Sequence, residues 1–98
     1  MRSATEGGRA LPEGLTAYKQ TPVFTAETVP AGLRRNHATK AGVWGLIHVT
    51  AGALVYRIAA TGETRRLTPN TPPGVIAPQE LHSVEPEGAV SFYVEFWR

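Results

Sequence analysis

Short stretches in which apolar and polar residues alternate, separated by glycine and proline, dominate the hydrophobic pattern of this chain. In the C-terminal stretch Val90–Trp97, Val, Phe, Val and Phe alternate with Ser, Tyr, Glu and Trp. This period of two predicts a β-strand with one apolar face. Ala53–Ile58 alternates in the same way. No segment of ten residues keeps a helical apolar period without glycine or proline, so the pattern predicts an all-β chain.

The same reading predicts five further strands. Thr50-Ala51-Gly52 is predicted to be a tight hairpin turn that joins two of the strands. Seven or eight short strands at this spacing make a β-sandwich or a small barrel. The additional strands are Val23–Val29, Trp44–Val49, Arg65–Thr68, Gly74–Ala77 and a segment that begins at His82.

The length of 98 residues suits one domain. Residues 1–10 lack an apolar core, so they are expected to form a flexible N-terminal tail rather than a signal peptide, with a single domain over residues 11–98. The longest charge-free apolar run, Ala41–Tyr56, contains three glycines and is too short to span a bilayer. We therefore expect a soluble, cytoplasmic protein with no membrane partner.

The charged residues narrow the candidate functions. The net charge is +2, and the basic residues are scattered, which argues against nucleic acid as a partner. The chain has no cysteine, so it can form neither disulfides nor thiolate metal sites. Aspartate is also absent. A carboxylate in a functional site must therefore come from glutamate, and Glu80 and Glu95 are the candidates.

Potential metal ligands gather around one predicted turn. Pro78 cannot donate a hydrogen bond within a sheet, so it ends the preceding strand and begins a turn. Gln79, Glu80 and His82 follow it, and His37 lies far upstream. Two imidazoles with an amide or carboxylate oxygen suit Zn, Fe, Ni or Mn. The alternative is that the two histidines only close one end of the sheet through hydrogen bonds.

His48 lies between two apolar residues of a predicted strand, and we expect it to be a structural or surface histidine.

Three separated motifs together are similar to a known superfamily. Gly32–Gly45, Val49–Gly52 and Pro78–Val84 resemble the two-motif layout of the cupin superfamily. More narrowly, the chain resembles the small cupin family related to the N-terminal domain of the tellurite-resistance methyltransferase. Leu11–Leu15 and the closing Tyr93-Val94-Glu95-Phe96 are similar to that family too. The resemblance covers nearly the whole of residues 11–98.

This resemblance implies a cupin-type jelly-roll β-barrel with a divalent metal at its mouth. His37 matches the histidine of the first motif, His82 matches the histidine of the second, and Gln79 takes the position after the proline. Thr39 replaces the other first-motif histidine, and the first-motif glutamate has no clear counterpart.

Four further residues are candidates for binding the ligand. Lys40 and Trp44 match family positions, and Lys40 could hold an anion at the rim. Glu80 and Glu95 complete this set.

The expected function is binding of a divalent metal and a small anionic molecule, in a response to tellurite or another oxyanion. The alternatives are a metal-dependent enzyme of the oxygenase or isomerase type and a structural dimerisation domain. Methyl transfer is not expected from this chain alone, because it has no glycine-rich nucleotide-binding stretch. We also expect a homodimer, because Tyr93 and Trp97 stand opposite the apolar face of their strand and Val23–Val29 is an unpaired edge.

Overall fold

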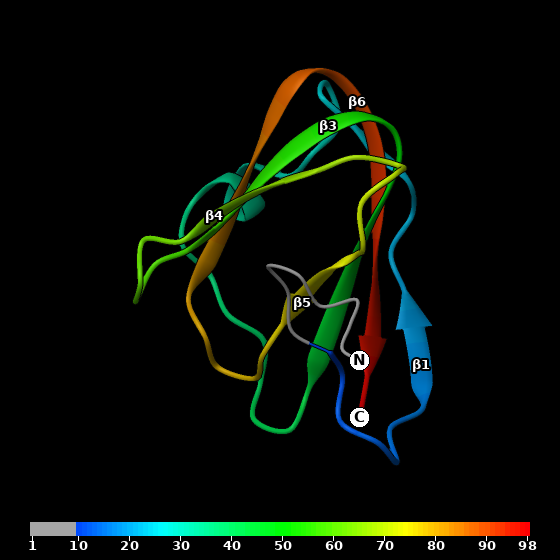
Figure 1. The fold of residues 1–98 in the computed structure, drawn as a ribbon, viewed down its shortest axis with the longest axis vertical. Coiled ribbons are helices and arrows are strands. Elements are labelled where there is room, and N and C mark those ends of the chain that lie inside the picture. The colour runs from blue at the N-terminus through cyan, green and yellow to red at the C-terminus, as the bar shows by residue number, and fades with distance from the viewer. Residues whose placement is uncertain (1–9) are drawn as a thin grey trace.

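Two long antiparallel strands organise the fold. β3 (Trp44–Ile58) and β6 (His82–Trp97) pair along nearly their whole length, and both curve over near the top of the view in Figure 1. The structure is a computed structural model that describes residues 10–98, so the predicted tail lies outside the described residues except for Ala10. Within residues 10–98 the chain is all-β apart from one short 3₁₀ helix, as the alternation predicts.

Four short strands extend this central pair into one antiparallel sheet. The strand order is β1-β6-β3-β4, while β2 pairs with β6 and β5 pairs with β3. The 3₁₀ helix η1 (Ala31–Arg34) lies between β2 and β3 in the chain. The short strands are β1 (Ala17–Gln20), β2 (Phe24–Thr25), β4 (Thr64–Leu67) and β5 (Gly74–Ile76).

The predicted hairpin turn at Thr50-Ala51-Gly52 is wrong, because these residues lie inside the continuous strand β3. The register with β6 shifts on either side of Ala51, as at a β-bulge. Gly52 has a φ of 75°, and a Cβ there would lie 2.1 Å from the carbonyl oxygen of Ala89. Glycine therefore allows the backbone of β6 to pass close by. Because glycine is also typical of tight turns, the sequence alone predicts a turn at this position.

The predicted strand Val23–Val29 is mostly a turn. Only Phe24–Thr25 pairs with β6, and the amide of Val29 then donates to the Thr25 carbonyl at 2.9 Å. The Thr28 hydroxyl also accepts a hydrogen bond from the Thr25 amide, which favours the turn over an extended chain. Six strands are present in residues 10–98, rather than seven or eight, because β3 and β6 each run through two predicted segments.

The apolar core lies on the inner face of β3 and β6. Phe92 is fully buried, whereas its neighbour Tyr93 on the other face is half-buried, which confirms the alternation read from the sequence. Tyr56 is also buried, and its hydroxyl donates to the Val75 carbonyl at 2.8 Å. The other large core residues are Ile47, Leu54, Ile58, Leu67, Ile76, Val84, Val90 and Val94. In the described part of the chain, no helix has the length and hydropathy needed to cross a lipid bilayer.

Candidate functional site

His37 and His82, 45 positions apart in the sequence, lie side by side in the structure. Each backbone amide donates to the carbonyl of the other residue at 2.9 Å, which forms an isolated antiparallel bridge. The centroids of the two imidazole rings are 4.0 Å apart, with the ring planes tilted by 56°. The sheet therefore brings together the histidines of the two sequence motifs, while their role as metal ligands remains a prediction.

Local hydrogen bonds orient both imidazoles in the same way. His37 Nδ1 is 2.9 Å from the carbonyl oxygen of Arg35, and His82 Nδ1 is 2.9 Å from that of Glu80. A carbonyl oxygen only accepts hydrogen bonds, so each Nδ1 must carry the proton. In its neutral form, the His37 ring then carries a lone pair on Nε2, which can bind a metal or accept a hydrogen bond.

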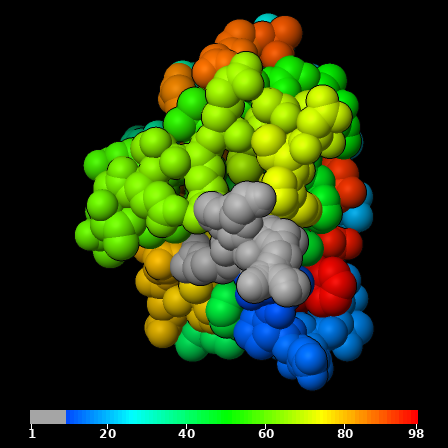
Figure 2. All heavy atoms as spheres, viewed as in Figure 1, coloured from blue at the N-terminus to red at the C-terminus, as the bar shows by residue number. Residues whose placement is uncertain are grey.

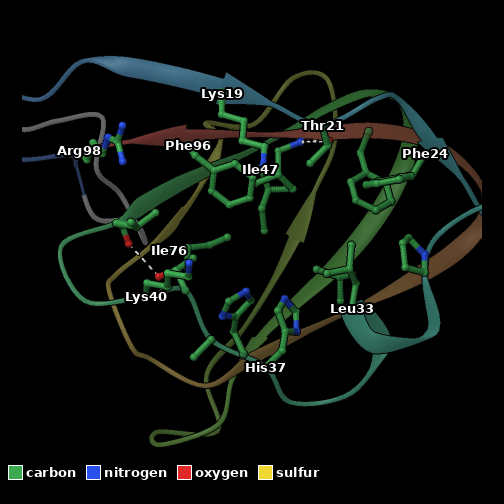
Figure 3. A pocket seen from close by; sticks show the side chains of 18 of the residues that line it. Lys19, Thr21, Phe24, Leu33, His37, Lys40, Ile47, Ile76, Phe96 and Arg98 are labelled. Carbon is green, nitrogen blue, oxygen red and sulfur yellow. Dashed lines mark hydrogen bonds between the residues drawn. The ribbon is translucent and has the colours of Figure 1, made fainter.

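The histidine pair lies in the wall of a cavity of about 560 Å³ (Figure 3). β6 provides much of its wall and β3 contributes Ile47, while β1, β2, β5, η1 and the segment before β3 provide most of the rest. Most of the lining residues are apolar: Phe24, Pro30, Leu33, Ala38, Val43, Ile47, Ile76, Val84, Phe92, Val94 and Phe96.

Three basic residues, Lys19, Lys40 and Arg98, also line this cavity, and no glutamate side chain of the described residues does. None of the three forms an ion pair with another residue in the range 10–98, and the Arg98 guanidinium lies 3.9 Å from the ring centroid of Tyr18. In contrast, the exposed Arg34 pairs with Glu85, which raises the pKa of the guanidinium. The cavity is therefore a positively charged environment that favours an anion.

Gln79, the third predicted metal ligand, does not line the cavity. It is exposed, adopts a φ of 61°, and donates its backbone N–H to the Thr39 carbonyl at 3.1 Å. Its observed role is to hold the turn before His82 against the segment after His37. Of the candidate ligand-binding residues, Lys40 lines the cavity and Trp44 does not.

The two candidate carboxylates also lie outside the cavity lining. Glu80 contributes its backbone carbonyl to the orientation of His82, and its Oε1 atom is shielded from solvent. Glu95 belongs to the outer face of β6, where its Oε1 atom is 3.1 Å from His48 Nε2 and accepts a hydrogen bond from the Trp97 indole at 3.1 Å. The ring of His48 stacks on Tyr93 at 4.8 Å, in agreement with the structural role expected from the sequence.

Sequence reasoning missed Lys19 and Arg98 as residues of the site. Both reach the cavity because β1 pairs with β6, with Lys19 opposite Phe96 and the Arg98 backbone bonded to Thr16 in both directions. Nothing in the local sequence marks this pairing, so no signal in the chain identifies the two residues.

The donor set does not complete the metal site predicted from the sequence. Residues 10–98 contain no group of three or more His, Cys, Asp or Glu side chains placed to hold a metal ion. His37 and His82 can supply two nitrogen ligands, whereas protein metal sites usually use three or four side chains. Anion binding thus has more support from the lining residues than tight metal binding has.

Comparison with known proteins identifies the relatives of this chain. Residues 19–94 match the family model of the TehB-like domain. Two proteins named "Probable S-adenosyl-L-methionine-dependent methyltransferase TehB", from Haemophilus influenzae strains KW20 and 10810, are 35% and 33% identical over 75 residues. Each match covers 72% of this chain but only 26% of the relative, so the chain corresponds to about a quarter of their length.

Solved structures support the same relationship. The crystal structure of TehB from Haemophilus influenzae superimposes with a TM-score of 0.77 at 29% identity, over 87% of this chain and 32% of that chain. A protein from Escherichia coli strain K12 matches with a TM-score of 0.83 over 92% of this chain and 96% of its own, and at 22% identity it shows a shared fold. The family match over most of the sequence and the identity to both curated relatives lead to one conclusion: this chain belongs to the TehB-like domain family.

Proposed function

We propose that this TehB-like domain is a binding module that takes up a small anionic molecule in the cavity beside His37 and His82. The observation that carries the proposal is the charge of the cavity lining, which includes three basic side chains and, among residues 10–98, no glutamate side chain. An anion entering this cavity would find Lys40 and Lys19 without competing internal ion pairs among residues 10–98.

The cavity combines basic side chains with apolar walls. The basic side chains draw an anion to the site, and the apolar walls lower the local dielectric constant, which strengthens the attraction. The lone pair on Nε2 of the neutral His37 ring can accept a hydrogen bond from a hydroxyl or protonated group of the ligand. Neither candidate carboxylate lies at the cavity, so a general base there would have to be His37 or His82, and we propose binding as the role that the basic lining supports best.

Calorimetric titration with acetate and with tellurite tests this proposal. Both anions should bind the native chain, and Lys40→Gln should weaken their binding by about three- to fivefold, because Lys40 is exposed to solvent and screened. Arg57→Gln is the matched control, since it removes one positive charge from an exposed residue of β3 away from the cavity. If no anionic probe binds the native chain, or if both variants lose the same affinity, the proposed function is wrong.

A divalent metal is the second candidate ligand. The specific observation in its favour is that the Nδ1 atoms of His37 and His82 are hydrogen-bonded to carbonyl oxygens, as metal-binding histidines commonly are. Zn, Fe, Ni or Mn would take these two nitrogens, with Gln79 as the predicted third ligand. Elemental analysis of protein purified without an affinity tag decides the matter. A stoichiometric metal that disappears in the His37→Ala, His82→Ala double variant is the expected result, and native protein without metal excludes it.

Several finer assignments from the sequence are also proposals. The cupin-type jelly-roll barrel is supported by the bent antiparallel β3–β6 pair, to which the shorter strands are added. The metal-dependent oxygenase or isomerase and the structural dimerisation domain remain alternatives. The homodimer rests on the half-buried aromatic residues of the outer face, Tyr93 and Trp97, and light scattering at micromolar concentration tests it. A cytoplasmic location is likewise a proposal.

The name of the Haemophilus influenzae relatives describes a protein about four times as long as the matched segment. We propose that this chain contributes ligand binding and no methyl transfer, and that it serves a response to tellurite or a related oxyanion. An assay with S-adenosyl-L-methionine and tellurite tests the first part, since methylated product formed by this chain alone would contradict it.

A further inference from the structure

We propose that the ligand of this cavity is an amphipathic carboxylate, a compact hydrophobic body carrying one carboxylate group, rather than a bare inorganic oxyanion. This inference rests on the proposed anion-binding function and specifies its ligand class. Three features support it, namely the size of the cavity, the hydrogen bonds already made by its polar groups, and the uneven distribution of its basic side chains.

The cavity is too large and too apolar for an inorganic oxyanion to fill. Its volume of about 560 Å³ falls in the range of pockets that hold organic ligands. Phe24 and Phe92 pack against each other at 5.6 Å between ring centroids and both face the cavity. Phe92 has no exposed surface, but Phe24, Leu33 and Phe96 are only partly buried, so a ligand that covers them removes apolar surface from water.

The polar groups inside the cavity are largely engaged with the protein itself. The hydroxyl of Thr21 donates to the Pro22 carbonyl and accepts from the Val94 amide, and the hydroxyl of Thr39 donates to the Val43 carbonyl. The Nδ1 proton of His37 is directed to Arg35. An oxyanion with three or four oxygens needs donors on every side, and burying it without them is costly. One carboxylate that stays near the lysines avoids this cost.

The basic side chains are unevenly distributed over the lining. Figure 3 shows Arg98 and Lys40 toward one end of the cavity, close to Ile76, and Phe24 and Leu33 at the other end, with Lys19 and His37 between them. A carboxylate beside Lys40 would leave the rest of the molecule directed toward Phe24 and Leu33. This polarity matches a ligand with one charged end and one apolar end, in which the two parts are recognised by different residues.

Calorimetric titration with phenylacetate as the probe tests this inference, with phenylacetamide, acetate and tellurite for comparison. Phenylacetamide keeps the apolar body without the charge, and acetate keeps the charge without the ring. Phenylacetate should bind about tenfold or more tightly than acetate, because the ring buries apolar surface. It should also bind about threefold or more tightly than phenylacetamide, because only the carboxylate is attracted to the exposed lysine.

Two variants separate the two ends of the cavity. Lys40→Gln should weaken phenylacetate and leave phenylacetamide unchanged. Leu33→Ala should weaken phenylacetate and leave acetate unchanged, whereas Leu81→Ala, at a residue 50% exposed and outside the cavity lining, should change neither. Leu33 is only half-buried in the short helix η1, so its truncation is compatible with a folded chain.

The titrations distinguish a failure of this inference from a failure of the proposed anion-binding function. If acetate and tellurite bind as tightly as phenylacetate and Lys40→Gln weakens them, the amphipathic ligand is wrong and the proposed anion-binding function stands. If phenylacetamide binds as tightly as phenylacetate, or if no anionic probe binds, the inference and the proposed function are both overturned.

Discussion

The two faces of the β3–β6 pair carry histidines with opposite environments. On the inner side, His82 is buried beside His37, and both rings are oriented by backbone carbonyls at the wall of a cavity with basic residues. On the outer side, His48 is about a quarter exposed, pairs with Glu95 and stacks on Tyr93. The outer histidine pairs with the carboxylate of Glu95, whereas the inner histidines face a cavity that Lys19, Lys40 and Arg98 also line.

Both faces carry histidines, so residue type does not distinguish them. The faces differ in which charged residues lie beside those histidines. The carboxylate of Glu95 satisfies both His48 and the Trp97 indole, so the outer group is a closed arrangement within the protein. At the cavity, Lys19 and Lys40 have no such carboxylate among residues 10–98 and can serve a ligand instead. Figure 2 shows segments distant in the sequence lying side by side on one face of the molecule, such as the blue N-terminal segment beside the red C-terminal one.

The largest effect on stability is expected at the bulge at Gly52, because both faces of the β3–β6 pair depend on the backbone there. Gly52→Ala should lower the free energy of unfolding by about 3 kcal/mol, because φ is positive and the new Cβ would meet the Ala89 carbonyl. Gly62→Ala is the control, with a φ of 71° and no atom within 4 Å of the added Cβ, and should cost about 1 kcal/mol. Urea denaturation measures both, and equal losses would show that the close strand crossing is unimportant.

The histidines themselves provide the next comparison. His82→Ala removes a side chain from a residue only 2% exposed and leaves the Glu80 carbonyl without its Nδ1 donor, so we expect a loss of about 2–3 kcal/mol. His48→Ala should cost less than about 1 kcal/mol, because its ion pair with Glu95 is partly exposed. Chemical denaturation of the two variants under one set of conditions compares them. If His48→Ala lost as much unfolding free energy as His82→Ala, or more, the prediction that the inner histidine contributes more to stability would be wrong.

The smallest effect is expected for Glu95→Gln on the outer face. The amide oxygen can still accept the hydrogen bond from the Trp97 indole, so the free energy of unfolding should change by less than about 0.5 kcal/mol. Acetate affinity should stay the same, because Glu95 is not part of the cavity lining. Thermal melts and calorimetric titration measure the two quantities. A clear change in affinity would restore Glu95 as the ligand-binding residue that the sequence predicts.

The sequence determined the all-β class, the buried face of the last strand and the turn that precedes His82. The alternation around Phe92 and the proline at Pro78 act locally, since side chains two residues apart share a strand face and proline cannot donate within a sheet. The family relationship could also be read from the chain, because its motifs are short and local. The turn at Pro78–Gln79 and the entry of His82 into β6 are both present in the structure.

Only the tertiary structure decided which residues meet at the cavity. Gly52 has the sequence signature of a turn, yet it lies in a bulge because β6 passes beside it. Lys19 reaches the cavity through the β1–β6 pairing, and Glu95 is excluded from it by the face of β6 on which it lies. Strand pairing joins residues tens of positions apart, and one shift in register or face changes which side chains share a site. That information depends on the whole fold, so a single strand pattern does not contain it.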